Sequence, residues 1–490
     1  MRVRHRIAVA WLVTAGLAVF AAPIARAESA DDAPITTTVL LRATVIDATG
    51  TAPRADQAVV VRGERIVAVG SSATVAAPPG AHVIDARGAY LIPGLWDLHV
   101  HVLRRERWRA YFPLLIAHGV VGVRDMGGDY DTQLVRRLRE DVDAGRLVGP
   151  RILAAGPFID GPWPSLPRLS RVVATDAEAR AVVRDLRREG FDFVKVYNRL
   201  PRDAFLALAE ESRRLGLAFA GHVPFSVSAR EASALGMRSI EHQFNVAFAC
   251  SSREDELMRL KARALAADES GERRRLRREY LTGVLDSFDP ARCGALYADF
   301  VRNGTAVVPT LVQRRDFSGS APPALVPDEL AYVPAAERGG WNPAQDARLQ
   351  GRAPQDRDIE RRFWERDRAL VAPMQAAGVT VLAGTDGGDP YTVPGFSLHA
   401  ELVELVSAGL TPMQALQAAT RNAAAFLGIP QDSGTIEPGR RADLVLLRAD
   451  PLADIRHTRQ IEAVMLGGRW LDRAALDALL SEARKQAAVP

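Results

Sequence analysis

Apolar runs of strand length alternate with amphipathic stretches through the middle of the chain, residues 92–430. Residues 176–190 and 202–216 carry apolar positions at helical spacing between such runs. The eight runs that we predict as strands are residues 95–101, 120–125, 151–156, 191–197, 218–223, 237–242, 306–310 and 379–386. The alternation predicts parallel βα units. Eight of them in roughly 340 residues favour an α/β fold of the (β/α)8, or TIM, barrel type, with a doubly wound open sheet as the alternative.

The two ends of this region show a different pattern, of short strands separated by turn residues. Residues 37–91 include QAVVVRGERIVAVG, in which Gly63 marks a hairpin turn between alternating runs. Residues 431–472 return to the pattern with RADLVLLR and IEAVMLGGRWLD. We therefore expect a small β-sandwich built from residues 37–91 plus 431–472, with the barrel of residues 92–430 inserted between its halves.

Two long segments interrupt the βα pattern. Residues near 251–292 are densely charged and helical, and residues near 314–367 are rich in Pro, Gly and Arg. Both follow predicted strand ends, on the side where a barrel carries its active site. They are either lids that shape a substrate pocket or solvated decoration and oligomer contacts. The sequence leaves a homo-oligomer open.

The N-terminus predicts a signal peptide. Three arginines lie in residues 1–6, residues 7–22 are apolar, and Ala25-Arg26-Ala27 has the form of a cleavage site. A membrane anchor, the alternative, needs about 20 apolar residues, more than this run supplies. We expect residues 1–27 to be removed by cleavage after Ala27, which predicts a periplasmic or secreted protein with no stable membrane anchor.

Cleavage of the signal peptide would change the net charge of the chain. Removing four of the 63 basic residues leaves 59, equal to the 59 acidic residues, so the composition gives no support for nucleic-acid binding.

The two cysteines, Cys250 and Cys293, fit no zinc motif by their spacing. In an oxidising compartment we expect them to form a disulfide, with two buried thiols or a metal role as alternatives.

Polar residues stand at the carboxyl ends of six predicted strands. In a barrel these ends face one side, where the active site lies. The residues are His99 and His101, Asp125, Lys195 and Tyr197, His222, His242, and Asp386. His99 and His101 are two apart, so their imidazoles share one strand face and could bind one metal ion of the zinc type. Asp125 we interpret as structural.

Lys195 stands out because it lies inside the apolar run Phe-Val-Lys-Val-Tyr. Burying a lysine is costly unless the amine is paired or modified. Four of the nine histidines occupy the strand ends described above. A chance arrangement of unrelated core residues is therefore the weaker explanation.

These motifs resemble the amidohydrolase superfamily of metal-dependent hydrolases over residues 37–472. The resemblance is carried by PGLWDLHVH (93–101), FVKVY (193–197), GHV (221–223), IEH (240–242), GTD (384–386) and GTIEPGRRADLV (434–445). The Lys-Val-Tyr and Gly-His motifs are similar to imidazolonepropionase-like proteins and to Xaa-Pro or Xaa-Arg dipeptidases. Imidazolonepropionase uses one metal and lacks the bridging lysine, so Lys195 favours the binuclear, peptidase-like branch.

The resemblance implies a role for each residue. His99, His101 and Asp386 would hold a first divalent ion, and His222 and His242 a second. Lys195 would be carbamylated and would bridge both ions. Zinc is expected, with manganese or iron as alternatives. Two such ions share and activate a hydroxide, and Asp386 would act as the catalytic general base.

The roles of four neighbouring residues stay open. Asp97 and Glu241 are candidates for hydrogen bonds that orient the imidazoles. Tyr197 binds substrate or an oxyanion, or is a core tyrosine. His399 contacts substrate, or has a helix-capping or surface role.

The sequence therefore predicts a binuclear amidohydrolase that cleaves an amide, peptide-like C–N bond of a small or dipeptide-like substrate. A lactonase, a cyclic-amide hydrolase or a deaminase on the same scaffold is the alternative, because fold and metal do not choose the substrate. A non-catalytic binding protein would be indicated by a missing ligand, and the predicted set is complete.

Overall fold

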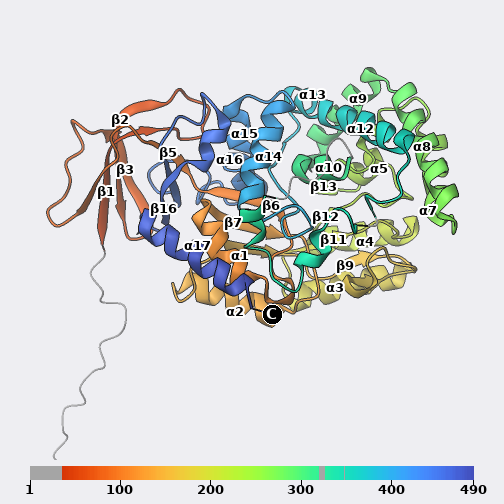
Figure 1. Ribbon diagram of the computed structural model, residues 1–490, viewed down its shortest axis with the longest axis horizontal. Helices are drawn as coiled ribbons and strands as arrows, with labels where there is room; N and C mark the ends of the chain where they lie inside the picture. Colours follow the sequence, from red (N-terminus) through yellow and green to blue (C-terminus); the bar gives the residue numbers. More distant parts are fainter. Residues whose placement is uncertain (1–35, 319–325, 347, 490) are drawn as a thin grey trace, which may run out of the picture. The chain divides into compact units, whose positions relative to one another are not determined.

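Both ends of the described chain join in one eight-stranded sheet (Figure 1). The computed structural model describes residues 36–318, 326–346 and 348–489. The strand order is β17-β16-β15-β5-β1-β2-β3, with β4 also paired to β1, and the N-terminal β5 meets the C-terminal β15 in antiparallel register. Within the described residues these strands form a single sheet, so the second layer that a β-sandwich requires is not confirmed.

The strands of this sheet follow the predicted alternation. Their bounds are β1 (Thr37–Val45), β2 (Arg54–Arg62), β3 (Arg65–Ser71), β4 (His82–Asp85), β5 (Tyr90–Pro93), β15 (Leu444–Leu447), β16 (Ile461–Leu466) and β17 (Arg469–Leu471). Gly63, at φ 54°, makes the turn between β2 and β3. Leu40, Val59, Leu444 and Met465 are buried together, so side chains from both chain ends make one apolar cluster.

The middle of the chain forms two parallel sheets. One has the order β6-β7-β8 and the other β10-β9-β11-β12-β13-β14. Their bounds are β6 (Leu95–Val100), β7 (Val120–Asp125), β8 (Arg151–Ala154), β9 (Phe158–Asp160), β10 (Ser170–Val172), β11 (Phe193–Val196), β12 (Ala218–Gly221), β13 (Ser239–Glu241) and β14 (Ala306–Val308). The α/β class is thus confirmed, and seven of the eight predicted strands coincide with observed ones.

Residues 379–386, predicted as the eighth strand, form no regular strand but connect the two sheets through backbone hydrogen bonds. Leu382 N donates to Val307 O in β14 at 3.0 Å. On the other side, Leu98 N in β6 donates to Ala383 O at 3.0 Å. The ends of β14 and β6 are therefore neighbours across this segment, although the strands are not assigned to one closed barrel.

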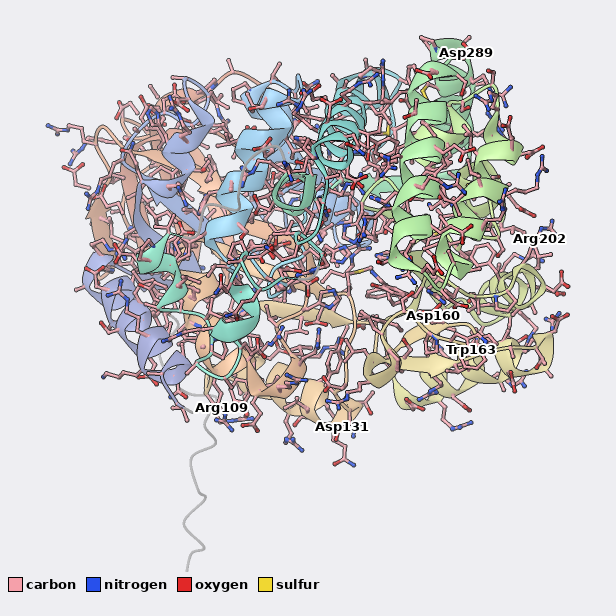
Figure 2. The ribbon with its side chains drawn as sticks, turned by 45° about the vertical axis from the view of Figure 1, so that its right-hand side comes forward. Arg109, Asp131, Asp160, Trp163, Arg202 and Asp289 are labelled. Carbon is pink, nitrogen blue, oxygen red and sulfur yellow. A yellow bond between two sulfur atoms is a disulfide. The ribbon has the colours of Figure 1, made fainter. Side chains whose placement is uncertain are left out.

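Helices follow most of the parallel strands. They are α1 (Trp108–Ala117), α2 (Thr132–Asp143), α3 (Asp176–Glu189), α4 (Arg202–Leu215), α5 (Ala229–Ala234), α9 (Pro290–Asn303), α13 (Val371–Ala376), α14 (Phe396–Ser407), α15 (Pro412–Ala418), α16 (Arg421–Phe426) and α17 (Arg473–Ala487). Asp131 and Asp289, labelled in Figure 2, start α2 and α9 by accepting from Leu134 N and Ala291 N at 2.7 and 2.9 Å.

The two predicted insertions are largely helical. The short α6 (Val246–Ala249) leads into the first insertion, which supplies α7 (Glu254–Ala266) and α8 (Ser270–Asp286). The second insertion begins within α10 (Leu311–Ser318) and supplies α11 (Pro327–Leu330) and most of α12 (Pro354–Ala369). Short 3₁₀ turns are η1 (Arg104–Glu106), η2 (Pro167–Leu169), η3 (Arg338–Trp341) and η4 (Ile455–Arg459). Arg277 of α8 pairs with Glu360 of α12, their Nη2 and Oε2 atoms 2.9 Å apart, so the insertions pack against each other.

The signal peptide predicted for residues 1–27 lies outside the described residues. Within the described part of the chain, no helix combines the length and apolarity needed to cross a bilayer.

Cys250 and Cys293 form a disulfide, with their Cα atoms 4.6 Å apart. The bond joins the end of α6 to the first turn of α9 and encloses α7 and α8. The first insertion is thus tied at both of its ends.

Replacing both cysteines, in Cys250→Ser with Cys293→Ser, is expected to lower the free energy of unfolding by about 2–4 kcal/mol, because the bond closes a long loop in the unfolded chain. Thermal unfolding with and without dithiothreitol measures the effect. The reductant should lower the melting temperature of the wild type and leave that of the variant unchanged. An unchanged wild type would contradict the prediction.

Candidate metal centre

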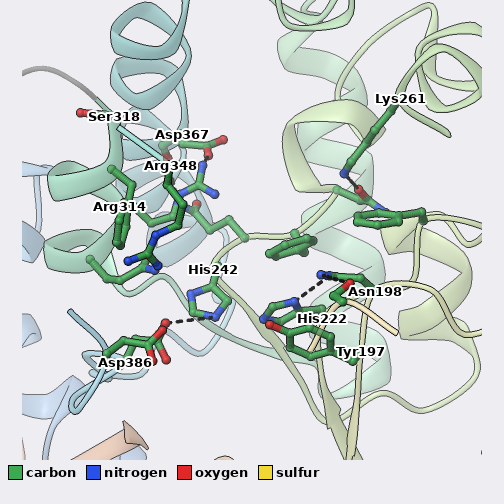
Figure 3. A pocket seen from close by; sticks show the side chains of 18 of the residues that line it. Tyr197, Asn198, His222, His242, Lys261, Arg314, Ser318, Arg348, Asp367 and Asp386 are labelled. Atoms are coloured by element: carbon green, nitrogen blue, oxygen red, sulfur yellow. Dashed lines mark hydrogen bonds and ion pairs between the residues drawn. The ribbon is translucent and has the colours of Figure 1, made fainter. Parts of the chain in front are cut away.

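Four histidines and one aspartate meet where the parallel strands end, and Figure 3 shows three of these residues, His222, His242 and Asp386. The Nε2 atoms of His99 and His101 each lie 3.2 Å from Asp386 Oδ1, and His242 Nε2 lies 3.9 Å from Asp386 Oδ2. The His222 ring centroid is 4.8 Å from that of His242. All five side chains are buried. The structure thus brings together five residues that the sequence separates by nearly 290 positions.

Local backbone geometry aims two of these side chains. His242 and Asp386 adopt φ values of 55° and 63°, in the left-handed region that non-glycine residues seldom occupy. His242 directly follows β13, and Asp386 ends the connecting segment of residues 379–386. Such conformations concentrate at functional sites, where the surrounding structure enforces them.

Each imidazole is held at Nδ1 by an oxygen atom. The four contacts are His99 to Glu241 Oε2 (2.7 Å), His101 to Gly127 O (2.8 Å), His222 to Asn198 Oδ1 (2.8 Å) and His242 to Thr310 Oγ1 (2.6 Å). A neutral ring that donates from Nδ1 keeps its lone pair on Nε2. Burial lowers the pKa of His222 and His242 well below the usual range, which favours this neutral form.

The residues present fit a metal ion. With Nδ1 donating to Glu241, a neutral His99 directs a lone pair at the Asp386 carboxylate, and within the described residues this buried Nε2 has no hydrogen-bond partner. Two acceptors 3.2 Å apart repel each other unless a cation lies between them. His99, His242 and Asp386 offer ligand atoms that all lie within 4.8 Å of one another.

Glu241 supports His99 through a buried ion pair. Its second oxygen, Oε1, accepts from Arg124 Nη2 at 2.9 Å, and Arg124 Nε donates to Leu98 O at 2.7 Å. Burial alone would raise the pKa of Glu241, but Arg124 and His99 hold it well below its usual range. The carboxylate therefore stays charged and fixes the His99 ring.

Asp97 has a different role from the one considered for it. Its Oδ1 accepts from the backbone nitrogens of His99 and Thr385 at 3.2 and 3.1 Å, and its Oδ2 accepts from Thr385 Oγ1 at 2.7 Å. It orients no imidazole but fixes β6 against the segment that carries Asp386. Asp125 is structural, because it accepts from Val102 N at 2.8 Å.

Lys195 lies on β11 with 1% of its surface exposed. Among the described residues its amine makes no hydrogen bond or ion pair, and it faces the rings of Phe158 and Tyr197 at 5.8 and 5.9 Å. Burial lowers the pKa of Lys195 to about 8. The lysine is therefore buried beside the centre without a permanent counter-ion.

Tyr197 and His399 have separate locations. The Tyr197 ring stacks between Phe158 and His222, at centroid distances of 4.8 and 4.3 Å, and lines the same pocket as the histidines. His399 of α14 is fully buried, and its Nδ1 lies 3.0 Å from Thr458 Oγ1 of η4. It is not among the residues that line this pocket, so the described structure gives no support to a substrate contact, and its burial excludes a surface role. Its position on α14 turns the ring toward the packed η4 segment.

A pocket of about 660 Å³ opens above the centre. The five residues of the centre and Lys195 line the bottom of this pocket, and we call them the pocket floor. The two insertions contribute further lining residues, which we call the pocket wall. They include Lys261, Arg277, Arg314, Phe363 and Trp364. The insertions therefore shape the pocket and are not remote decoration.

Three residues near the floor escaped the sequence analysis. Asn198 and Thr310 hold His222 and His242, and both are polar residues at predicted strand ends, which was the available signal. Asp389 lines the pocket three residues after Asp386. Burial and the neighbouring Asp386 raise the pKa of Asp389.

Comparisons with known proteins agree with this geometry. Residues 342–471 match the model of the amidohydrolase family. A stretch of 83 residues is 42% identical to the imidazolonepropionase of Deinococcus deserti, covering 17% of this chain and 20% of that protein.

Solved structures share the fold over nearly the whole chain. Bottromycin amidohydrolase is 26% identical with a TM-score of 0.73, and the match covers 92% of this chain and 91% of that one. A Xaa-Pro dipeptidase is 20% identical with a TM-score of 0.64, covering 89% of this chain and all of the dipeptidase, which shows a common fold. The chain thus resembles the amidohydrolase family in the sequence of residues 342–471 and an amidohydrolase of known structure over most of its length, which supports a hydrolase of the class that acts on carbon–nitrogen bonds.

Proposed function

We propose that the protein is a binuclear metal-dependent amidohydrolase that hydrolyses an amide C–N bond of a small, dipeptide-like substrate. One observation carries the proposal: three imidazoles held at Nδ1, those of His99, His101 and His242, turn Nε2 toward the Asp386 carboxylate, beside a buried lysine without a counter-ion. Such an arrangement suits cations in the centre better than any set of protein hydrogen bonds.

The assignment of ligands follows their positions. His99, His101 and Asp386 would hold the first ion and His222 and His242 the second. Lys195, carbamylated at its amine, would bridge them; its lowered pKa favours the neutral amine that this modification needs. When bound, zinc, manganese or iron would supply Lewis acidity and lower the pKa of water toward about 7.

The chain's own residues would move the proton and hold the substrate. The Asp386 carboxylate lies among the Nε2 atoms of His99, His101 and His242, where the ions would bind, so it would be in position to act as a base. Asp386 would accept the proton of the attacking water and deliver it to the leaving amine. Burial raises the pKa of Tyr197, so its hydroxyl keeps its proton and can donate to the substrate carbonyl.

The proposal extends to the architecture and the compartment. The backbone hydrogen bonds of residues 379–386 to β14 and β6 support one (β/α)8 barrel over residues 92–430, inserted between residues 37–91 and 431–472 of a composite β-domain. The disulfide and the N-terminal pattern of residues 1–27 support a periplasmic or secreted enzyme.

Metal titration tests the centre. Zinc added to chelator-treated protein is expected to bind at two ions per chain. Asn198→Ala removes the partner of His222 Nδ1 and should weaken binding about 10–100-fold. Asn303→Ala is the matched control, because Asn303 donates to Ser233 Oγ at 3.0 Å outside the pocket. Binding of one ion or none per chain would overturn the binuclear assignment.

A substrate screen tests the reaction. The mature protein, prepared with zinc or manganese, is expected to hydrolyse dipeptides or N-acyl amino acids. Asp386→Asn should lower kcat at least about 100-fold, because the base is lost. Asp131→Asn, the same exchange at the start of α2, should leave kcat unchanged, since Asn caps a helix as well as Asp.

Two outcomes would contradict this function. Retained activity in Asp386→Asn would exclude the proposed base. Turnover of lactones, cyclic amides or amino-substituted rings with inert linear amides would favour a lactonase, cyclic-amide hydrolase or deaminase on the same scaffold.

A further inference from the structure

A second buried lysine lines the pocket wall and has no part in the proposed chemistry. Only three of the 63 basic residues are lysines, and two of them, Lys195 and Lys261, line this pocket. Lysine presents a compact ammonium group where arginine presents a broad planar one. A chain that otherwise uses arginine has a lysine at position 261, on α7.

Lys261 lies in an aromatic cage. Its Nζ is 5.0, 5.4 and 4.7 Å from the ring centroids of Phe225, Phe244 and Phe248, and only 8% of the residue is exposed. Aromatic faces stabilise a cation at such distances. The cage therefore favours a small positive group and leaves little room for a guanidinium.

Asn245 fixes the direction of the ammonium group. Asn245 Oδ1 accepts from Lys261 Nζ at 2.6 Å. The asparagine is itself anchored, because its Nδ2 donates to Pro224 O and Val227 O at 3.3 and 3.1 Å. Since an ammonium has three N–H groups, Asn245 leaves others for a ligand in the pocket.

The charge of Lys261 is not balanced by a carboxylate within 4 Å among the described residues. The nearby Arg277 and Arg314 already pair with Glu360 and Asp367. Burial, together with these two arginines, lowers the pKa of Lys261 to about 7. An anion entering the pocket would offset both effects.

A single ring separates Lys261 from the pocket floor. Phe244 stacks on His222 with their centroids 4.2 Å apart, and its own centroid is 5.4 Å from Lys261 Nζ. Figure 3 shows Lys261 across the pocket from Arg314 and Arg348. A substrate whose amide lies at the floor would thus bring a group a few bonds away to Lys261.

We propose that Lys261 binds a carboxylate of the substrate, which makes the enzyme selective for dipeptides or N-acyl amino acids with a free acid group. The inference rests on the proposed function for the amide that is cleaved. Binding of an acid to Lys261, however, needs no turnover and is measured independently.

The test uses Lys261→Met in the full mature enzyme as purified. Methionine keeps an unbranched apolar chain among the phenylalanines, although Asn245 Oδ1 loses its hydrogen-bond donor, so a modest loss of stability is expected. Lys485→Met, on the exposed face of α17, is the matched control. Circular dichroism and thermal unfolding should show all three proteins folded, with Lys261→Met melting at the temperature of the wild type or slightly below it.

Calorimetry compares 3-phenylpropionate with the neutral 3-phenylpropanol. The wild type and Lys485→Met are expected to bind the acid at least about 10-fold more tightly than the alcohol, as expected for a charge-assisted hydrogen bond. Lys261→Met is expected to bind the two equally. An acid preference that survives in Lys261→Met would overturn the proposal.

Kinetics separate this inference from the function beneath it. For an active dipeptide and its C-terminal carboxamide, Lys261→Met should raise KM for the acid about 10–100-fold and leave that for the carboxamide unchanged. Equal effects on both would refute the role of Lys261 while amide hydrolysis stands. Lysine-dependent binding of the acid with no amide cleaved would refute the function and keep the anion site.

Discussion

The Glu241 carboxylate holds two buried groups at once, and the geometry of the candidate centre depends on it. One oxygen receives the ring N–H of His99, and the other receives the guanidinium of Arg124. Arg124 lies on β7 and also donates to β6 at Leu98 O, while Glu241 ends β13. Since removing one partner would leave a buried charge unpaired, the same ion pair orients a proposed ligand and joins three strands from two sheets.

The other three imidazoles are fixed by uncharged partners, which cost less free energy to bury than a carboxylate. A backbone carbonyl holds His101, an amide holds His222 and a hydroxyl holds His242. None of these adds a charge to the pocket floor. The net charge of the pocket floor therefore depends only on Asp386, Lys195 and the proposed ions. With few other charges nearby, a bound cation would strongly lower the pKa of a water molecule beside it.

The sequence predicts the floor well and the wall poorly, for a physical reason. His99, His222 and Asp386 belong to short parallel strands whose carboxyl ends must converge, so their order along the chain implies their proximity. Lys261 belongs to a helix whose packing depends on side-chain contacts between two insertions, and no periodicity encodes these. His399 shows the same limit, because a residue soon after the last strand was expected at the pocket and instead packs against η4. The second layer expected for the β-domain rested on hairpin patterns alone, which do not distinguish one curled sheet from two.

The disulfide constrains the pocket wall but not the pocket floor. Cys250 and Cys293 enclose α7 and hence Lys261, whereas no residue of the pocket floor lies between them. Reduction of the disulfide would make the pocket wall more mobile and would leave the hydrogen bonds of the imidazoles unchanged. On the proposed assignment, the recognition of substrate, unlike the binding of metal, is thus a property that the protein completes only in an oxidising environment.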